Sequence, residues 1–143
     1  MIETLDKSKP WAYFDGASQN QTCGGGFVLH LSKNLSFHIK LGLGQGTNNY
    51  AELLTLKLLL LFAKEKDLRH LQIFGDSMFI VNWARKLQQC HNIFLLPILE
   101  DILRLMEEFD TVTISHVYRN MNMVEDALSK VGPPLAMGQW HIT

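Results

Sequence analysis

The sequence contains few cysteines, and this scarcity limits how the fold can be held together. Cys23 and Cys90 are the only two among 143 residues, and neither belongs to a zinc-binding motif or a disulfide framework. A chain of this length can bury a hydrophobic core without disulfide bonds. We therefore expect one intracellular domain over residues 1–143, in the cytoplasm or the nucleus, with reduced thiols. Residues 1–10 and about 132–143 are expected to be peripheral segments.

Apolar runs long enough to cross a membrane are also missing. The first seven residues lack the apolar core of a signal peptide. The leucine run at 58–61 is short and fits the core side of a helix. We therefore expect no membrane partner.

The chain has no excess of positive charge. Lys and Arg number 13 and Asp and Glu number 14, which gives a formal net charge of −1. Proteins that bind nucleic acid unaided usually carry an excess of cations that neutralise phosphates. Either the partner is not a nucleic acid, or a neighbouring domain or a bound metal assists the binding.

Hydrophobic periodicity predicts strands and helices in a definite order. The predicted strands cover residues 11–17, 27–31, 35–43, 71–74 and 111–117, and the predicted helices cover about 50–66, 77–86, 93–108 and 124–130. Thr47 or Asn48 is expected to cap the long helix. Gly24-Gly25-Gly26 reads as a strand entry, because no helix or Gly-Lys-Ser/Thr follows it. The order predicts one mixed sheet with helices packed on it.

Four acidic residues occur at the boundaries of these elements. Asp15 and Asp76 lie near strand ends, Glu52 lies in the first turn of the long helix, and Asp126 lies near the start of the last helix. Each alone has a simpler explanation, since Asp76 could cap a helix and Glu52 could favour a helix N-terminus. If folding brings all four together, their repulsion requires a cation among them. The pattern therefore predicts a carboxylate site for a divalent metal.

Four segments together resemble a type 1 ribonuclease H domain, in particular the reverse-transcriptase-associated version found in plant retroelements. They are Tyr-Phe-Asp-Gly-Ala at 13–17, Thr-Asn-Asn-Tyr-Ala-Glu-Leu at 47–53, Gly-Asp-Ser at 75–77 and His-Val-Tyr-Arg-Asn-Met-Asn-Met-Val-Glu-Asp-Ala-Leu-Ser-Lys at 116–130. The set covers nearly the whole chain in the family's order. The resemblance implies an α/β, ribonuclease H-like fold: a mixed five-stranded sheet, made of a three-strand antiparallel meander plus two parallel strands, with helices on both faces.

The resemblance also implies an activity, the hydrolysis of the RNA strand of RNA–DNA hybrids to 5′-phosphate and 3′-hydroxyl ends. Asp15, Glu52, Asp76 and Asp126 match the catalytic acids that bind two Mg²⁺ ions, for which Mn²⁺ could substitute. The residues that match substrate contacts are Gly16, Ala17, Ser18, Thr47, Asn48, Asn49, Ser77 and Asn122. The expected partners are the hybrid and a fused reverse transcriptase domain, and we expect a monomer.

Some assignments stay open at this point. His116 matches either a histidine of a mobile loop that aids product release or a strand-end histidine, and Arg119 is the alternative occupant of that loop. Residues 77–110 contain no basic, aromatic-rich handle of the bacterial kind, since Arg85, Lys86 and Arg104 are the cations there. Two rival functions therefore remain: an inactive ribonuclease H-like domain kept for binding or scaffolding, and a related nuclease acting on other DNA or RNA structures.

Overall fold

The computed structural model describes residues 5–118 and 140–142, which form six strands and three helices. The strands are β1 (Trp11–Gln19), β2 (Thr22–Ser32), β3 (Leu35–Gln45), β4 (His70–Gly75), β5 (Thr111–His116) and β6 (Trp140–Ile142). The helices are α1 (Asn48–Glu65), α2 (Met78–Ala84) and α3 (Leu96–Glu107). None of these helices is long and apolar enough to span a membrane.

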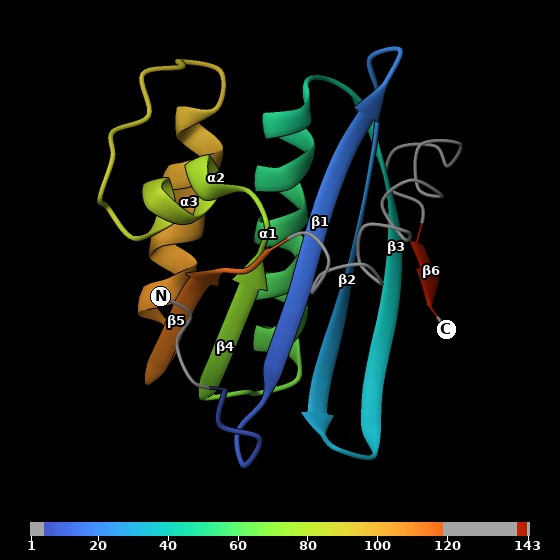
Figure 1. Cartoon of the computed structure of the whole chain (residues 1–143), viewed down its shortest axis with the longest axis vertical. Coiled ribbons are helices and arrows are strands. Elements are labelled where there is room, and N and C mark those ends of the chain that lie inside the picture. The colour runs from blue at the N-terminus through green and yellow to red at the C-terminus, as the bar shows by residue number, and fades with distance from the viewer. Residues whose placement is uncertain (1–4, 119–139, 143) are drawn as a thin grey trace.

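All six strands belong to one sheet with the order β5-β4-β1-β2-β3-β6 (Figure 1). The pairs β1–β2, β2–β3 and β3–β6 are antiparallel, whereas β1–β4 and β4–β5 are parallel. The predicted meander and the two predicted parallel strands are therefore confirmed. The short strand β6 was not predicted, because three residues are too few to show a periodic pattern.

Two predicted helix boundaries differ from the structure for local reasons. The third helix begins at Leu96 and not near residue 93. The Asn92 side chain accepts the Phe94 N–H at 2.9 Å and forms a turn there before the helix starts. Helix α2 ends at Ala84, and the chain then reverses through Lys86, whose φ is +61°. The helix predicted at 124–130 lies outside the described residues.

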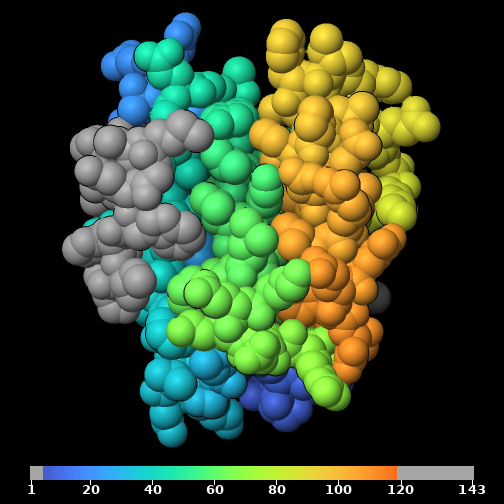
Figure 2. Space-filling view, turned by 180° about the vertical axis from the view of Figure 1, so that it is seen from behind, coloured from blue at the N-terminus to red at the C-terminus, as the bar shows by residue number. Residues whose placement is uncertain are grey.

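Helix α1 is apolar almost all round because it is covered on two sides. Its residues Leu53, Leu56 and Leu60 are fully buried in the core that the sheet also lines. Helix α3 lies beside α1 on the same face of the sheet, and the two helices form the back of the molecule (Figure 2). A helix that is buried on two sides carries apolar residues around most of its circumference and not in one stripe. The leucines of α1 are distributed in this way.

Ion pairs join the outer sides of α1 and α3. Lys57 Nζ lies 3.0 Å from Asp101 Oδ2, and Lys64 pairs with Glu108 in the next turns. The hydrogen bond from Lys57 is the main reason that the pKa of Asp101 lies below its ordinary value. Because these groups are still partly exposed to water, each pair contributes little to the stability of the fold.

The segment before β1 is attached to β4 through Gln72. The Gln72 side chain accepts the Asp6 N–H at 2.8 Å and donates to the Asp6 carbonyl at 2.7 Å. On the sheet face away from α1, Trp11, Phe74 and Val117 form a second, smaller apolar cluster. Both features add contacts around the parallel pair β1 and β4, and the parallel pairing itself gives the two strands the same direction.

Glycines in β2 allow α1 to lie close to the sheet. Gly24, Gly25 and Gly26 are paired with Ala17, Gly16 and Asp15 of β1, so they lie inside the strand. A Cβ on Gly25 would lie 1.9 Å from Thr55 Oγ1 of α1. The glycine run therefore makes room for the helix that carries Glu52.

We predict that Gly25→Ala lowers the free energy of unfolding by about 1–3 kcal/mol, the usual cost of overpacking a core. Urea unfolding measures the change. In a Thr55→Ala background the same substitution should cost less, because the hydroxyl that the new methyl meets is gone. An equal cost in both backgrounds would show that the contact between Gly25 and Thr55 does not limit the approach of α1.

Candidate metal centre

The centre forms where the pairing between β1 and β4 stops. The parallel register ends at the pair Phe14 and Gly75, and the next residue on each strand is an acid, Asp15 or Asp76. Parallel strands place their carboxyl ends at one edge of the sheet. The two acids therefore lie near each other because the pairing between β1 and β4 stops just before them. Asp76 follows the end of β4 as predicted, but β1 continues to Gln19, so the prediction that Asp15 lies at a strand end is wrong.

Glu52 comes from α1 and reaches the same point. Because α1 begins at Asn48, Glu52 lies in the second turn, and the prediction that it lies in the first turn is wrong. The helix dipole acts mainly in the first turn. A backbone donor compensates here: the Gly16 N–H is directed at Glu52 Oε1 and also lies 2.9 Å from Asp15 Oδ1. One amide thus orients two of the acids.

Gly16 also sets the distance between α1 and β1. A Cβ at this position would lie 2.5–2.6 Å from the backbone C and O of Ala51 and the N of Glu52. Backbone atoms cannot move aside as a flexible side chain can. The absence of a side chain at Gly16 is therefore what lets Glu52 approach Asp15.

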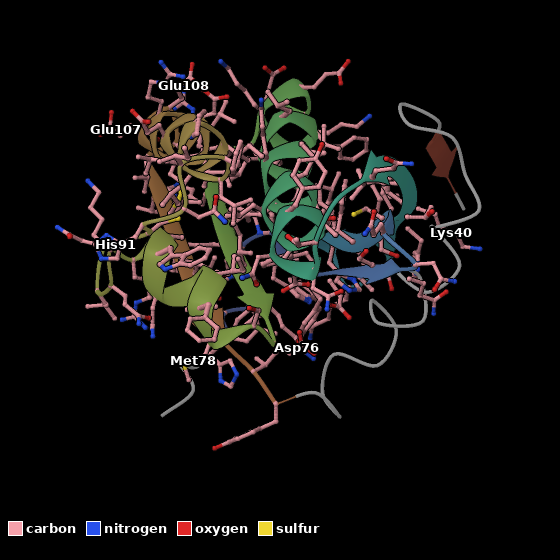
Figure 3. The ribbon with its side chains drawn as sticks, turned by 90° about the horizontal axis from the view of Figure 1, so that it is seen from above. Lys40, Asp76, Met78, His91, Glu107 and Glu108 are labelled. Carbon is pink, nitrogen blue, oxygen red and sulfur yellow. The ribbon has the colours of Figure 1, made fainter. Side chains whose placement is uncertain are left out.

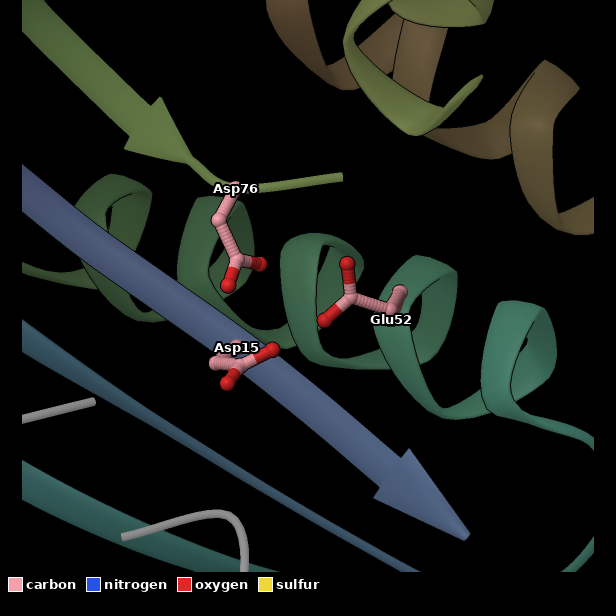
Figure 4. A group of neighbouring side chains, drawn as sticks. All are labelled: Asp15, Glu52 and Asp76. Carbon is pink, nitrogen blue, oxygen red and sulfur yellow. The ribbon is translucent and has the colours of Figure 1, made fainter. Parts of the chain in front are cut away.

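The three carboxylates face one another (Figure 4). One oxygen from each of Asp15, Glu52 and Asp76 lies within 4.8 Å of the others. Asp15 is 4% exposed and Glu52 is 5% exposed, while Asp76 is half-buried. Ionised carboxylates repel strongly at this separation in a poorly solvated place, and a divalent cation removes the repulsion. Oxygen ligands of this kind suit a hard cation such as Mg²⁺ or Mn²⁺.

The residues around the start of α1 are held against β1. Ser18 N donates to Asn48 Oδ1 at 2.7 Å, and Ser18 Oγ donates to the Gly46 carbonyl at 2.7 Å. Since the Asn48 oxygen accepts this bond, its amino group is the part that can donate to a ligand. Thr47 caps α1 by accepting the Tyr50 N–H at 3.2 Å, which confirms one of the two predicted caps. Asn49 follows on the helix and is half-buried.

Cys23 lies beneath this segment and was not predicted to have a local role. Its thiol donates a hydrogen bond to the Thr47 carbonyl at 3.6 Å. Burial raises the pKa of Cys23 above its ordinary value. The group therefore stays a protonated thiol at neutral pH and acts as a small packing residue.

The remaining predicted residues fall into two groups. Ser77 caps α2 by accepting the Ile80 N–H at 3.5 Å, and His116 ends β5 with its ring close to Asp76. The strand-end position of His116 is thus the one that the structure shows. Asn122, Arg119 and Asp126 lie outside the described residues.

Comparison with known families decides the relationship. The family described as reverse transcriptase-like matches residues 13–132. The chain belongs to this family. It is also similar to ribonuclease H1 from the halophilic archaeon Halobacterium salinarum, with 27% identity over 87% of this chain and 96% of the other, and a TM-score of 0.79. These matches confirm the ribonuclease H-like fold and the reverse-transcriptase-related group that the sequence predicted.

More distant structures share the fold. The ribonuclease H1 named LC11, solved in complex with an RNA/DNA hybrid, is 21% identical over 88% of this chain and 97% of its own, with a TM-score of 0.76. Prototype foamy virus protease–reverse transcriptase is 15% identical and has a TM-score of 0.73, over 94% of this chain and 22% of the viral protein. No curated protein matches the chain.

We predict that neutral substitutions in this family member's acidic cluster stabilise the metal-free protein. Asp76→Asn and Glu52→Gln keep the shape of the side chain but remove one charge. The expected gain in the free energy of unfolding is at least about 1 kcal/mol, the repulsion of two unit charges about 4 Å apart in water. Urea unfolding in the presence of a chelator measures it, with the exposed Asp110→Asn as the control.

Addition of Mn²⁺ should then stabilise the parent protein more than either variant. If chelator and Mn²⁺ gave the same stability for all three proteins, the acids would not share a cation.

Proposed function

We propose that this domain is a metal-dependent endonuclease that cuts the RNA strand of RNA–DNA hybrids. The observation that carries the proposal is the convergence of Asp15, Glu52 and Asp76 from three separate elements of a ribonuclease H-like fold. The hybrid complexes of LC11 ribonuclease H1 and of the foamy viral protease–reverse transcriptase support the same substrate for this chain. The products would carry 5′-phosphate and 3′-hydroxyl ends.

The chain's own acids would hold two Mg²⁺ ions, with Asp126 as a fourth ligand beside Asp15, Glu52 and Asp76. The donor set fits, because every ligand is a carboxylate oxygen and the cluster concentrates negative charge. When bound, the metals would activate a water and stabilise the leaving oxygen of the phosphodiester. The Gly16 amide orients Asp15 and Glu52 for this task.

Thr47, Asn48 and Asn49 would read the hybrid beside the acids, together with Gly16, Ala17, Ser18, Ser77 and Asn122. An RNA strand displays its 2′-hydroxyl groups in a wide minor groove. The Asn48 amino group can donate to such oxygens, because its own oxygen is already used by Ser18. Ser18 would therefore contribute in two ways. Its backbone N–H would hold the Asn48 side chain, and its own backbone would approach the RNA strand.

The formal net charge of −1 favours assisted binding. Lys40 of β3 lies well away from Asp76 (Figure 3). The cations Arg85 and Lys86 follow the end of α2. We infer that this monomeric domain, spanning residues 1–143 and acting in the cytoplasm or nucleus, is fused to a reverse transcriptase domain. That neighbour would supply much of the affinity for the hybrid.

We predict that Asp15→Asn and Asp76→Asn each abolish Mg²⁺-dependent cleavage of a labelled hybrid, because each removes a charged metal ligand. Cleavage by purified protein, with Mg²⁺, with Mn²⁺ and with chelator, measures this. Asp110→Asn should cut like the parent. Cutting by either site variant at the parent's rate would contradict the metal assignment. A parent that binds hybrid but never cuts it would favour the inactive alternative.

A second prediction concerns strand recognition. Asn48→Ala and Asn49→Ala should each raise the KM for hybrid about five- to tenfold, the effect of losing one hydrogen bond of about 1 kcal/mol, with a smaller change in kcat. Asn34→Ala, an exposed asparagine at the other end of β2, is the control. If KM stayed constant in both variants, the asparagines would not contact the substrate.

A further inference from the structure

His116 contacts the backbone of Asp76 through its ring. Its Nε2 lies 3.2 Å from the Asp76 carbonyl oxygen. Because a carbonyl oxygen can only accept, Nε2 must carry the hydrogen and donate it. The bond therefore joins the end of β5 to the residue whose carboxylate faces Asp15 and Glu52.

This bond begins where the sheet pairing ends. The last pair between β4 and β5 is Gly75 and His116, and the Val117 N–H donates to the Gly75 carbonyl at 2.9 Å. Asp76 follows β4 and has left the strand, so the ladder does not continue to its carbonyl. The His116 side chain supplies the donor that a longer strand would have supplied.

The residues on both sides of Asp76 are also fixed. A Cβ on Gly75 would lie 2.6 Å from the Phe14 ring, so the backbone of β4 lies directly against this ring. Ser77 caps α2. With its neighbours held, the bond from His116 adds a restraint on the peptide that follows Asp76 and so on the backbone from which the carboxylate projects.

We propose that His116 is a positioning residue that fixes the direction in which the Asp76 carboxylate enters the metal centre. This inference rests on the proposed function, since it assigns His116 to the same centre. Metal ligands must be placed within a few tenths of an ångström, and groups that orient the ligands affect metal affinity. The role needs the ring as a hydrogen-bond donor to the protein. The ring's edge-to-face contact with Tyr118, with centroids 5.9 Å apart, supports its orientation.

The test compares His116→Phe, which keeps a ring but has no donor, with His116→Gln, which keeps a nitrogen donor at similar reach. His70→Phe is the matched control, because His70 bonds Thr111 at 2.7 Å at the opposite end of the same two strands. Calorimetry with Mn²⁺ measures metal binding without substrate. Hybrid cleavage measures the Mg²⁺ concentration for half-maximal rate and the KM for hybrid.

We expect His116→Phe to weaken Mn²⁺ binding about tenfold and to raise the half-maximal Mg²⁺ concentration by a similar factor. The KM for hybrid at saturating metal should be unchanged. His116→Gln should recover most of the loss, and His70→Phe should behave like the parent. Thermal unfolding with chelator checks that the variants fold, and His116→Leu replaces the phenylalanine variant if that one does not.

Two results would overturn the inference while leaving the proposed function intact. One is unchanged Mn²⁺ binding in His116→Phe beside a parent that binds metal and cuts. The other is a glutamine variant as impaired as the phenylalanine variant, since donation to Asp76 would then not be the role of the ring. A parent that neither binds Mn²⁺ nor cuts would instead reject the proposed function.

Discussion

The contact of α1 with the backbone of β1 at Gly16 is the constraint on which the rest of the structure depends. The helix lies so close that position 16 tolerates no side chain. On the neighbouring strand, the lack of a side chain at Gly25 leaves room for Thr55 in the same way. This proximity brings Glu52 to the strand that carries Asp15. It also frees one amide, that of Gly16, to serve both carboxylates. The close packing of α1 on β1 therefore also determines the geometry of the site.

The acidic cluster lowers the stability of this closely packed region. Asp15 and Glu52 are almost fully buried, and buried charges without compensation are among the most unfavourable features of a protein. A purely structural role could be filled by neutral residues of the same shape. Three converging carboxylates, two of them oriented by the Gly16 N–H, are what a cation site requires. The surrounding apolar core supplies the stability that the cluster removes.

Much of this arrangement could be predicted from the sequence, because some signals are local. Alternation located β1 and β3, and the Gly75-Asp76 pair marked the end of β4. Other features depend on contacts between distant segments and leave no local signal. The glycines of β2 look like a strand entry until their register with β1 is known. The three residues of β6 are defined only by pairing with β3.

Side-chain turns explain the remaining differences. Asn92 delays the start of α3 because its carboxamide accepts the Phe94 N–H, a competition that apolar periodicity does not register. Glu52 falls in the second turn of α1 because the Thr47 cap starts the helix two residues before the first apolar position. Asp126, the fourth predicted acid, lies outside the described residues, so its convergence with the other three stays a prediction.

The hydrogen bonds from Ser18 to Asn48 and to Gly46 have a consequence for where a strand would be cut. They join the residues that would read the hybrid to the same strand, β1, that carries Asp15. If the proposed function holds, the groups that read the strand and those that cut it would thus be joined through β1 and the start of α1. A hybrid bound by these groups would be cleaved at a constant number of nucleotides from the one that Asn48 contacts, whatever its sequence. The domain itself would then set the distance between the nucleotide it contacts and the bond it cuts.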